Sequence, residues 1–185
     1  MKTPISPNEA RVILHSADEI CSAKLVTDTV ARMADDINAT LKNTNPLVLC
    51  AMRGSLVFAG QLLPRLNFPL EVDTLDVTRY ANSTRGAGIT FRHWPAAEVR
   101  GRTVLLLDDI LDEGVTLTAI REKLLMEGAT RVCIGVFAVK DVPRKTAVHV
   151  DFAGVTLPNR YVFGFGMDVY GYWRNLPAIY ALKDS

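Results

Sequence analysis

The segment Val104–Thr116, VLLLDDILDEGVT, holds the densest group of side chains that could do chemistry. An apolar run leads into two adjacent carboxylates, Asp108 and Asp109, and a turn with Asp112 precedes a helix start. In parallel α/β sheets, ligands bind beyond the carboxyl ends of the strands, which is where this segment puts its acids. The backbone N–H groups of the turn, the Thr116 hydroxyl and the helix N-terminus can together bind a phosphate. The alternative is a plain strand-to-helix turn in which Asp112 caps the helix.

Other common phosphate and metal motifs are missing from the sequence. It has no GxxxxGK[ST] motif, a GxGxxG pattern starting at Gly164 fails at Val169, and the carboxylate spacing of a calcium loop fails at Leu111. The histidines are isolated from one another and from the cysteines, so a zinc site is not expected. The cysteines are predicted to be reduced core thiols: Cys21, Cys50 and Cys133.

The first part of the chain predicts two helices and two strands. A capping box at Ser16–Glu19, followed by apolar residues at steps of four and three, predicts a long amphipathic helix up to Leu41. Leu47–Met52 is a continuous apolar run, as expected for a strand buried on both faces. A second helix over 56–66 stops before a proline, and Leu70–Val77 is the next predicted strand.

The second part of the chain continues this alternation after an interruption. Tyr80–Pro95 is rich in Gly, Ser, Thr and Asn, which predicts a mobile excursion. Val104–Leu107 and Val132–Val139 are predicted strands, separated by a helix that Gly128 ends. Alternating strands and helices predict an α/β fold, with a mostly parallel twisted sheet and helices on both faces.

Composition describes one ordinary domain with little net charge. The chain has 185 residues, of which 49% are hydrophobic, and its 21 Lys and Arg balance 20 Asp and Glu. Any anionic partner must therefore be held by a local site, and neither nucleic acid nor an anionic membrane is an expected partner. The longest apolar stretch, Val132–Val139, has eight residues, and the first residues lack a signal-peptide core, so a cytoplasmic protein is expected.

Four stretches resemble a known family. Val104–Thr116 is similar to the phosphoribosyl-pyrophosphate (PRPP) signature of type I phosphoribosyltransferases. Met52–Ser55, Val139–Arg144 and Tyr161–Pro177 narrow the resemblance to hypoxanthine-guanine phosphoribosyltransferases. The resemblance implies purine salvage, in which the phosphoribosyl group of PRPP passes to hypoxanthine or guanine and gives IMP or GMP and pyrophosphate. It also implies a small hood formed from the terminal segments.

The resemblance implies where PRPP and its magnesium ion bind. Pyrophosphate would be held by Arg174 and by the turn Arg53–Gly54–Ser55. In the family this turn contains a cis peptide bond, which would fall at Met52–Arg53 in this chain. Asp168, Asp108 and Asp109 would bind Mg²⁺, the expected cofactor. Read alone, the turn could be an ordinary connection, Arg174 a surface residue and Asp168 a cap. The ribose phosphate would be bound by Asp108, Asp109, Asp112, Glu113, Gly114, Val115 and Thr116.

Purine recognition is expected from Lys140, Tyr161 and Val162. A lysine ammonium only donates hydrogen bonds, so Lys140 matches the 6-oxo group of hypoxanthine or guanine and leaves the 6-amino group of adenine unmatched. The Tyr161 ring could stack on the purine or pack in the core, and the Val162 carbonyl could accept from a guanine 2-amino group. Asp112 is the expected general base for the purine proton.

The resemblance further implies a single domain over 1–185, with a mobile lid at about 78–95 and a purine-binding hood from about 141–185 together with the N-terminal segment. Arg79 and Tyr80 would belong to the lid, where the family usually has serine in place of Arg79. Asp108 stands where glutamate is usual, and Glu113 where a Thr or Ser donates to the phosphate. Because like charges repel, Glu113 is expected to point away from the phosphate.

Two other functions share part of this pattern. A PRPP-sensing regulator of the same fold that binds RNA or a protein should show a basic face, which the balanced charge disfavours. A xanthine-preferring enzyme would need an additional donor at the purine 2-position, for which the sequence suggests no residue. The family resemblance also implies a homodimer or homotetramer.

Overall fold

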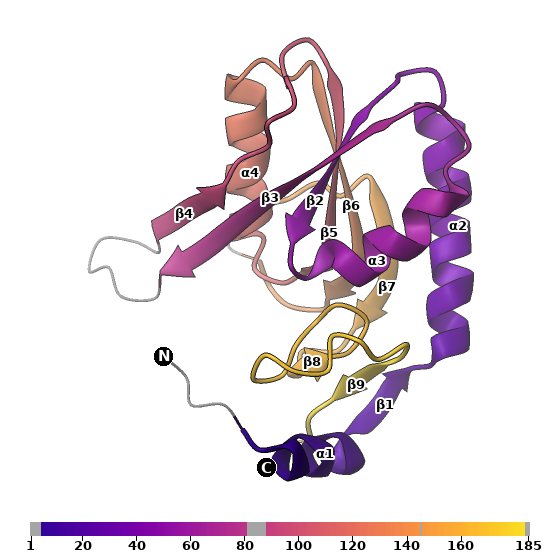
Figure 1. Ribbon diagram of the computed structural model, residues 1–185, viewed down its shortest axis with the longest axis vertical. Helices are drawn as coiled ribbons and strands as arrows, with labels where there is room; N and C mark the ends of the chain where they lie inside the picture. Colours follow the sequence, from indigo (N-terminus) through magenta and orange to yellow (C-terminus); the bar gives the residue numbers. More distant parts are fainter. Residues whose placement is uncertain (1–4, 81–87, 145, 184–185) are drawn as a thin grey trace.

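A six-stranded sheet forms the centre of the computed structural model, which describes residues 5–80, 88–144 and 146–183 (Figure 1). The strand order is β4-β3-β2-β5-β6-β7. Only β4 runs antiparallel to its neighbour, which confirms the prediction of a mostly parallel sheet. The strands are β2 (Leu47–Met52), β3 (Glu71–Tyr80), β4 (Gly88–His93), β5 (Thr103–Leu111), β6 (Arg131–Lys140) and β7 (Phe152–Leu157).

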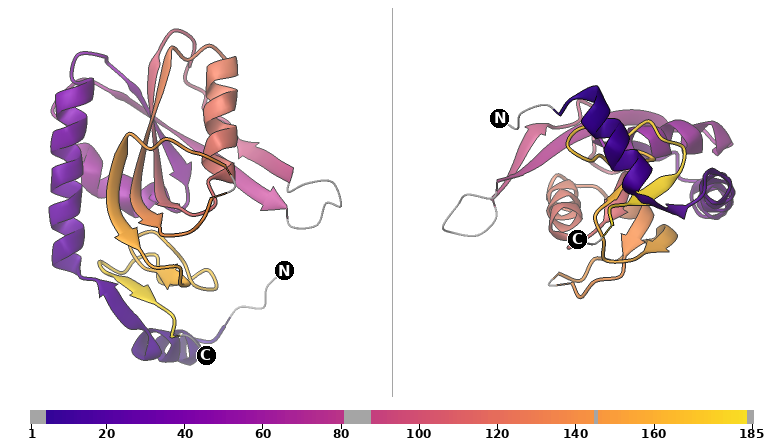
Figure 2. Two further views of the ribbon diagram at one scale, coloured as in Figure 1. Left: turned by 180° about the vertical axis from the view of Figure 1, so that it is seen from behind. Right: turned by 90° about the horizontal axis from the view of Figure 1, so that it is seen from below.

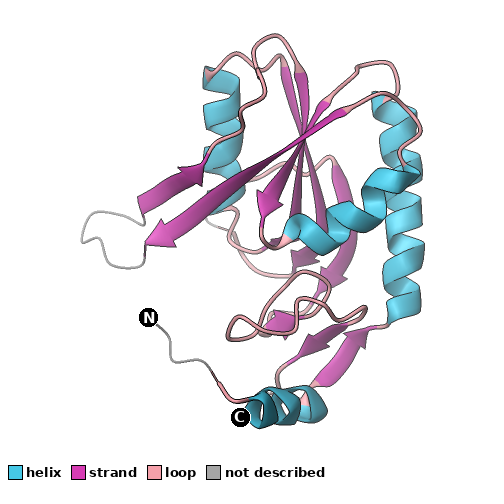
Figure 3. Ribbon diagram, in the orientation of Figure 1, coloured by secondary structure: helices cyan, strands magenta, loops and turns pink. Residues whose placement is uncertain are grey.

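Helices cover both faces of this sheet, as predicted (Figure 3). α2 (Ala23–Leu41) and α3 (Ser55–Leu62), which a short 3₁₀ turn at Leu63–Arg65 follows, bury their apolar residues in one core cluster. α4 (Val115–Met126) packs into a second cluster on the other face. Both faces of β2 are thereby buried, which explains its continuous apolar sequence.

A hood made from both ends of the chain lies beyond the carboxyl ends of the parallel strands (Figure 2). Its antiparallel sheet has the order β1-β9-β8, with β1 at Asp18–Cys21, β8 at Val162–Phe163 and β9 at Ile179–Ala181. α1 (Pro7–Ser16) lies next to this sheet (Figure 1). A hood from the terminal segments is confirmed, but residues 152–157 of the expected range 141–185 form β7 of the central sheet and do not belong to the hood. The hood faces the sheet edge at which α/β proteins bind ligands.

The start of the chain differs from the prediction. The capping box forms at Ser6 and not at Ser16: the Glu9 backbone N–H donates to Ser6 Oγ at 3.2 Å, and the Ser6 N–H donates to Glu9 Oε2 at 2.6 Å. Residues 18–21 pair with β9, so α2 begins only after Ser22, whose hydroxyl caps it. A long-range strand pairing has overridden the local helix signal.

The sheet is also larger than the sequence predicted. β4 pairs with β3 over residues 88–93 of the expected excursion, a strand that the sequence had not predicted. Residues 81–87 lie outside the described residues, and the motion of a lid stays a prediction. β5 continues past Leu107 to Leu111 because it keeps its pairing with β6, and β7 was not predicted.

The three cysteines are buried and free, as predicted. Among the helices of the described residues, none has the length and apolar character needed to cross a membrane.

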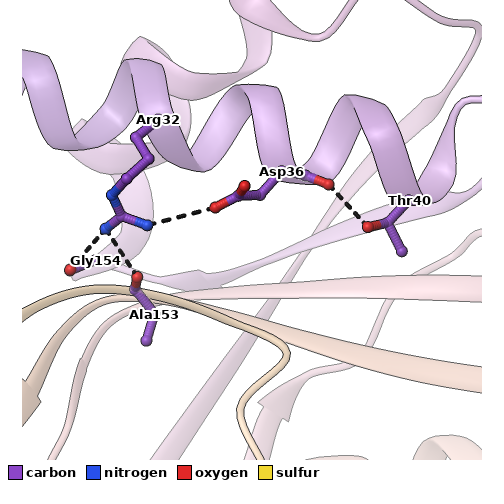
Figure 4. Close-up of polar contacts among 5 residues, drawn as sticks. All are labelled: Arg32, Asp36, Thr40, Ala153 and Gly154. Atoms are coloured by element: carbon purple, nitrogen blue, oxygen red, sulfur yellow. Dashed lines mark hydrogen bonds and ion pairs between the residues drawn. The ribbon is translucent and has the colours of Figure 1, made fainter.

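Arg32 ties α2 to the edge strand β7 (Figure 4). Its Nη2 donates to the carbonyl oxygens of Gly154 at 2.8 Å and Ala153 at 3.1 Å, whereas Nη1 lies 3.4 Å from the exposed Asp36 carboxylate.

We expect Arg32→Ala to lower the free energy of unfolding by about 1–2 kcal/mol, since hydrogen bonds to a charged group are lost. Asp36→Asn removes only a surface ion pair and should cost less than about 0.5 kcal/mol. Urea unfolding of both variants measures this difference. Equal losses of unfolding free energy would show that the hydrogen bonds from Arg32 to the β7 backbone do not stabilise the fold.

Candidate active site

Three cavities meet at the acids of β5. The loop cavity is lined by Asp108 and Ile110–Leu117. The turn cavity is lined by Ala51–Gly54, Val77, Asp108, Asp109, Thr116, Ile120 and Arg174. The hood cavity is lined by Asp109, Ile110, Asp112, Lys140, Tyr161, Val162, Met167, Asp168 and Arg174.

The acids stand where these cavities adjoin. Asp108 and Asp109 are neighbours in β5, and both line the turn cavity. Asp108 also lines the loop cavity, and Asp109 also lines the hood cavity. Asp112 lines both the loop and the hood cavity. A molecule with three arms could thus occupy all three cavities and keep its centre at the acids.

The loop cavity has the form of an anion-binding turn. Gly114 adopts φ +82° immediately before α4, and the helix receives no side-chain hydrogen bond at this end, so Asp112 is not its cap. A Cβ at Gly114 would lie 2.7 Å from Val148 Cγ2, so the position requires glycine for space as well as for conformation. Residues Asp112 to Thr116 all line the cavity, and Glu113 among them is exposed. A helix N-terminus behind such a turn favours a phosphate.

The surroundings of Asp108 and Asp109 disfavour the ionised form of both carboxyl groups. Asp109 is only 9% exposed, and its backbone N–H donates to Asp108 Oδ1 at 3.0 Å. Removal from water, and then the neighbouring Asp109 charge, raise the pKa of Asp108 well above its usual value. Burial also raises the pKa of Asp109, although Asp108 and Arg174 oppose this shift. Hydroxyl donors or a cation at this point would relieve the cost of ionising the pair.

Close backbone contacts fix the turn after β2 against the acids. The peptide bond Met52–Arg53 is cis, as the resemblance implied. A Cβ at Gly54 would lie 2.0 Å from Asp109 Oδ2, and a Cβ at Gly166 would lie 2.1 Å from the Gly54 carbonyl oxygen. The turn is therefore held between β5 and the hood. Gly166 was not predicted as a site residue, because its only signal in the sequence is a glycine inside the stretch Tyr161–Pro177.

The residues of the turn Arg53–Gly54–Ser55 differ in whether they line the turn cavity. Arg53 is exposed and lines the turn cavity together with Gly54. Ser55 is fully buried, does not line that cavity, and uses its hydroxyl to donate to the Ala51 carbonyl at 2.8 Å. Among the expected pyrophosphate residues, the cavity therefore presents Arg53, Gly54 and Arg174.

Gly54→Ala tests this packing. We expect the added methyl group to displace the buried Asp109 carboxylate and to lower turnover by about 10- to 100-fold, because small misplacements of reacting groups cost up to about 100-fold. Gly60→Ala, in the helix α3 that follows Gly54, is the matched control, since a Cβ there meets no atom within 4 Å. It should raise the free energy of unfolding by about 0.5–1 kcal/mol and leave turnover unchanged. Similar kinetics for the two variants would show that Gly54 packing is unimportant.

The hood cavity brings together the expected purine residues. Lys140 ends β6, and its Nζ lies 3.3 Å from Asp112 Oδ2. Tyr161 is 53% exposed, so it does not pack in the core, and its hydroxyl donates to the Asp168 carbonyl oxygen at 3.2 Å. Burial, and then the Asp168 charge, raise the pKa of the Tyr161 phenol. Val162 is buried in β8 and lines the same cavity.

Asp168 and Arg174 face each other at the border of the turn and hood cavities. Arg174 Nη1 donates to the Gly166 carbonyl at 2.6 Å, and Nη2 pairs with Asp168 Oδ1. The other oxygen of Asp168 accepts from the Gly171 N–H at 2.8 Å. The structure thus joins the two residues expected at magnesium and pyrophosphate. The expected lid residues Arg79 and Tyr80 lie at the end of β3, and their side chains are outside the described part.

The donor set fits a magnesium ion that a substrate completes. Within the described residues, no group of three or more His, Cys, Asp or Glu could hold a metal on its own. Mg²⁺ usually takes one or two carboxylates and fills its shell with water and substrate phosphates. Asp168 and Asp109, which line one cavity, offer the hard oxygen ligands that this arrangement needs.

Comparisons with known proteins agree with this geometry. Residues 16–170 match the phosphoribosyl transferase domain family. The chain is 30% identical over 167 residues to the hypoxanthine-guanine phosphoribosyltransferase of Bacillus subtilis, covering 90% of this chain and 93% of that protein. It is 28% identical to the hypoxanthine-guanine-xanthine phosphoribosyltransferase of Tritrichomonas foetus, over 100% of this chain and 97% of the relative.

A solved structure supports the fold. The hypoxanthine phosphoribosyltransferase of Staphylococcus aureus superposes with a TM-score of 0.87 at 22% identity, covering 93% of this chain and 95% of that chain. The family match spans the β5 acids, the turn after β2 and most of the hood cavity. With the fold, the acid pair and the family match in agreement, the chain belongs to the phosphoribosyltransferases and, among them, to the hypoxanthine-guanine phosphoribosyltransferases.

Proposed function

We propose that the protein is a purine-salvage enzyme that transfers the phosphoribosyl group of PRPP to hypoxanthine or guanine and releases pyrophosphate. The observation that carries this proposal is the junction of the three cavities at Asp108 and Asp109. The ribose of PRPP carries a 5′-phosphate and a pyrophosphate, and the purine is the third group that must reach this ribose. Three cavities around one pair of acids match three groups around one ribose.

Each cavity suits one part of the substrates. The turn at residues 112–116 offers backbone donors and the Thr116 hydroxyl to the 5′-phosphate. Arg53 and Arg174 offer guanidinium groups to pyrophosphate, which they can bind in a bidentate manner. The hood cavity offers the purine an aromatic face from Tyr161 and a donor from Lys140.

The reaction needs charge stabilisation more than covalent chemistry. As the bond from C1′ to pyrophosphate breaks, positive charge builds on the ribose, and Asp108 and Asp109 lie where they can orient its hydroxyls and stabilise this charge. Asp112 stands between the loop and hood cavities, where a carboxylate can take the purine proton. When bound through Asp168, Mg²⁺ would neutralise charge on the leaving pyrophosphate.

We infer a cytoplasmic enzyme that acts on small molecules, and a homodimer or homotetramer in solution. The stretch from Thr78 to Pro95 would close over the site and exclude water, which otherwise hydrolyses PRPP. Size-exclusion chromatography with light scattering measures the oligomeric state directly.

One assay tests the function. Purified protein is given PRPP and Mg²⁺ with hypoxanthine, guanine, xanthine or adenine in turn, and pyrophosphate release is measured. Turnover with hypoxanthine and guanine that disappears when EDTA removes magnesium supports the proposal. Turnover with xanthine alone would favour the xanthine-preferring reading. PRPP binding without turnover of any base would contradict an enzyme and support the regulator.

Glu113→Thr tests how the loop meets the phosphate. Glu113 is exposed, and water weakens its repulsion of a bound phosphate. We therefore expect the dissociation constant of PRPP, measured by calorimetry with Mg²⁺, to change less than about tenfold, which corresponds to about 1.4 kcal/mol. A larger gain in affinity would show that the carboxylate crowds the phosphate.

A further inference from the structure

Arg144 joins the two chain segments that carry Asp112 and Lys140. Its Nε donates to the Asp112 backbone carbonyl at 3.0 Å, and its Nη2 donates to the Lys140 backbone carbonyl. Asp112 belongs to the turn before α4, whereas Lys140 is the last residue of β6. One part-buried guanidinium thus bridges the phosphate-binding turn and the purine-binding strand end.

Arginine has the donor geometry that this bridge needs. A guanidinium presents several N–H groups in one rigid plane, so it can hold two carbonyl oxygens at a fixed separation. A lysine ammonium is a point donor on a flexible stem and would hold the two carbonyls less rigidly. The Lys140 carbonyl also accepts from the Val142 N–H at 3.1 Å, which folds the chain back so that Arg144 reaches it.

The connection between β6 and β7 supports the phosphate-binding turn at a second point. A Cβ built at Gly114 would lie 2.7 Å from Val148 Cγ2 and 3.4 Å from the Thr146 carbonyl oxygen. Val148 also packs against the apolar cluster that contains Leu111 and Leu117. The described residues of this connection therefore contact the turn through a guanidinium at Asp112 and through side-chain packing at Gly114.

The bridge bears directly on the pair of side chains proposed for base recognition and proton transfer. Lys140 Nζ and Asp112 Oδ2 lie 3.3 Å apart, and both groups line the hood cavity. The pairing of β5 with β6 holds the two backbones together as far as Leu111 and Val139, the residues directly before Asp112 and Lys140. Past the end of this pairing, the Arg144 guanidinium connects the two segments with hydrogen bonds to the backbone of both residues.

We propose that Arg144 is a positioning residue, which sets the distance between the Asp112 carboxylate and the Lys140 ammonium and so couples purine binding to the state of the phosphate-binding turn. This inference rests on the proposed function, because it assigns Arg144 a part in the same reaction. Arg144 lines none of the three cavities and acts through the backbone of its two partners. Its loss should disturb proton transfer and base recognition more than PRPP binding, since the acids and the pyrophosphate residues keep their own contacts.

The kinetic test compares Arg144→Ala and Arg144→Lys with Arg131→Ala, which removes an exposed arginine from the opposite end of β6. We expect Arg144→Ala to lower kcat by about 10- to 100-fold, the range for a misplaced reacting group, and to raise the KM of hypoxanthine more than that of PRPP. Arg144→Lys should be intermediate, and Arg131→Ala should match the wild type. Millimolar methylguanidinium should restore part of the kcat of Arg144→Ala. Kinetics of Arg144→Ala equal to those of Arg131→Ala, or no rescue of a folded Arg144→Ala protein, would overturn the proposal.

Hydrogen exchange tests the same contact without substrate. We expect faster amide exchange at residues 112–116 in Arg144→Ala, and no change there in Arg131→Ala. If exchange at residues 112–116 is faster in Arg144→Ala but the wild-type protein releases no pyrophosphate, the proposed function is contradicted and the structural role of the Arg144 contact is supported. Normal wild-type turnover with unchanged exchange in Arg144→Ala would contradict the role of Arg144, so the two failures are distinguishable.

Discussion

Asp112→Asn is expected to lower kcat by about 10²- to 10⁴-fold, the usual contribution of a positioned proton acceptor. The amide keeps the shape of the side chain and can still accept a hydrogen bond from Lys140, whose Nζ lies 3.3 Å from Asp112 Oδ2. It cannot take the purine proton. The KM of PRPP should change much less, because donors of the turn and not this carboxylate would hold the phosphate. Steady-state kinetics with hypoxanthine and PRPP separate the two effects.

Asp141→Asn is the matched control for this variant. Asp141 is an exposed acid that follows Lys140 directly and lines neither the loop nor the hood cavity. The same loss of one negative charge near the site should therefore leave kcat unchanged. If Asp112→Asn keeps most of the wild-type turnover, Asp112 is not the general base, and the proton must leave through water or phosphate.

The parallel core was predictable from the sequence because its signals are local. Leu47–Met52 forms β2 with the predicted bounds, since a strand buried on both faces must be apolar throughout. The helix after the acid loop ends where Gly128, with φ +96°, was expected to end it. Both signals come from residues that are close together in the chain, so they can be recognised from the sequence alone.

The hood was predicted only through the resemblance because its contacts are long-range. Asp18–Cys21 looks like a helix start, and it becomes a strand because residues 179–181 pair with it. The same holds within the site. The sequence indicated Gly54 and Asp109 separately, but it could not show that Gly166 lies close to both of them. It also included Arg144 in a motif without showing that its guanidinium reaches Asp112.

Lys140 should set the choice of base, and its effect should be the largest on selectivity. We expect wild-type kcat/KM for hypoxanthine to exceed that for adenine by about 10⁴-fold, because a site with a fixed polar group rejects a ligand that leaves it unpaired. Lys140→Ala should remove most of this preference. The ratio of the two kcat/KM values is the measurement, since a general loss of activity lowers both values and leaves their ratio unchanged.

The pairing of Lys140 with Asp112 requires a second comparison. Lys140→Ala also removes the cation beside the proposed base, so kcat can fall for a reason other than base recognition. Asp112→Asn provides the control: it should lower the rates with both purines and keep their ratio, whereas Lys140→Ala should change the ratio. PRPP affinity should be nearly the same in both variants, because Lys140 lines the hood cavity and not the turn or loop cavities. Equal wild-type turnover of adenine and hypoxanthine, or a large loss of PRPP affinity in Lys140→Ala, would show that this lysine does not recognise the base.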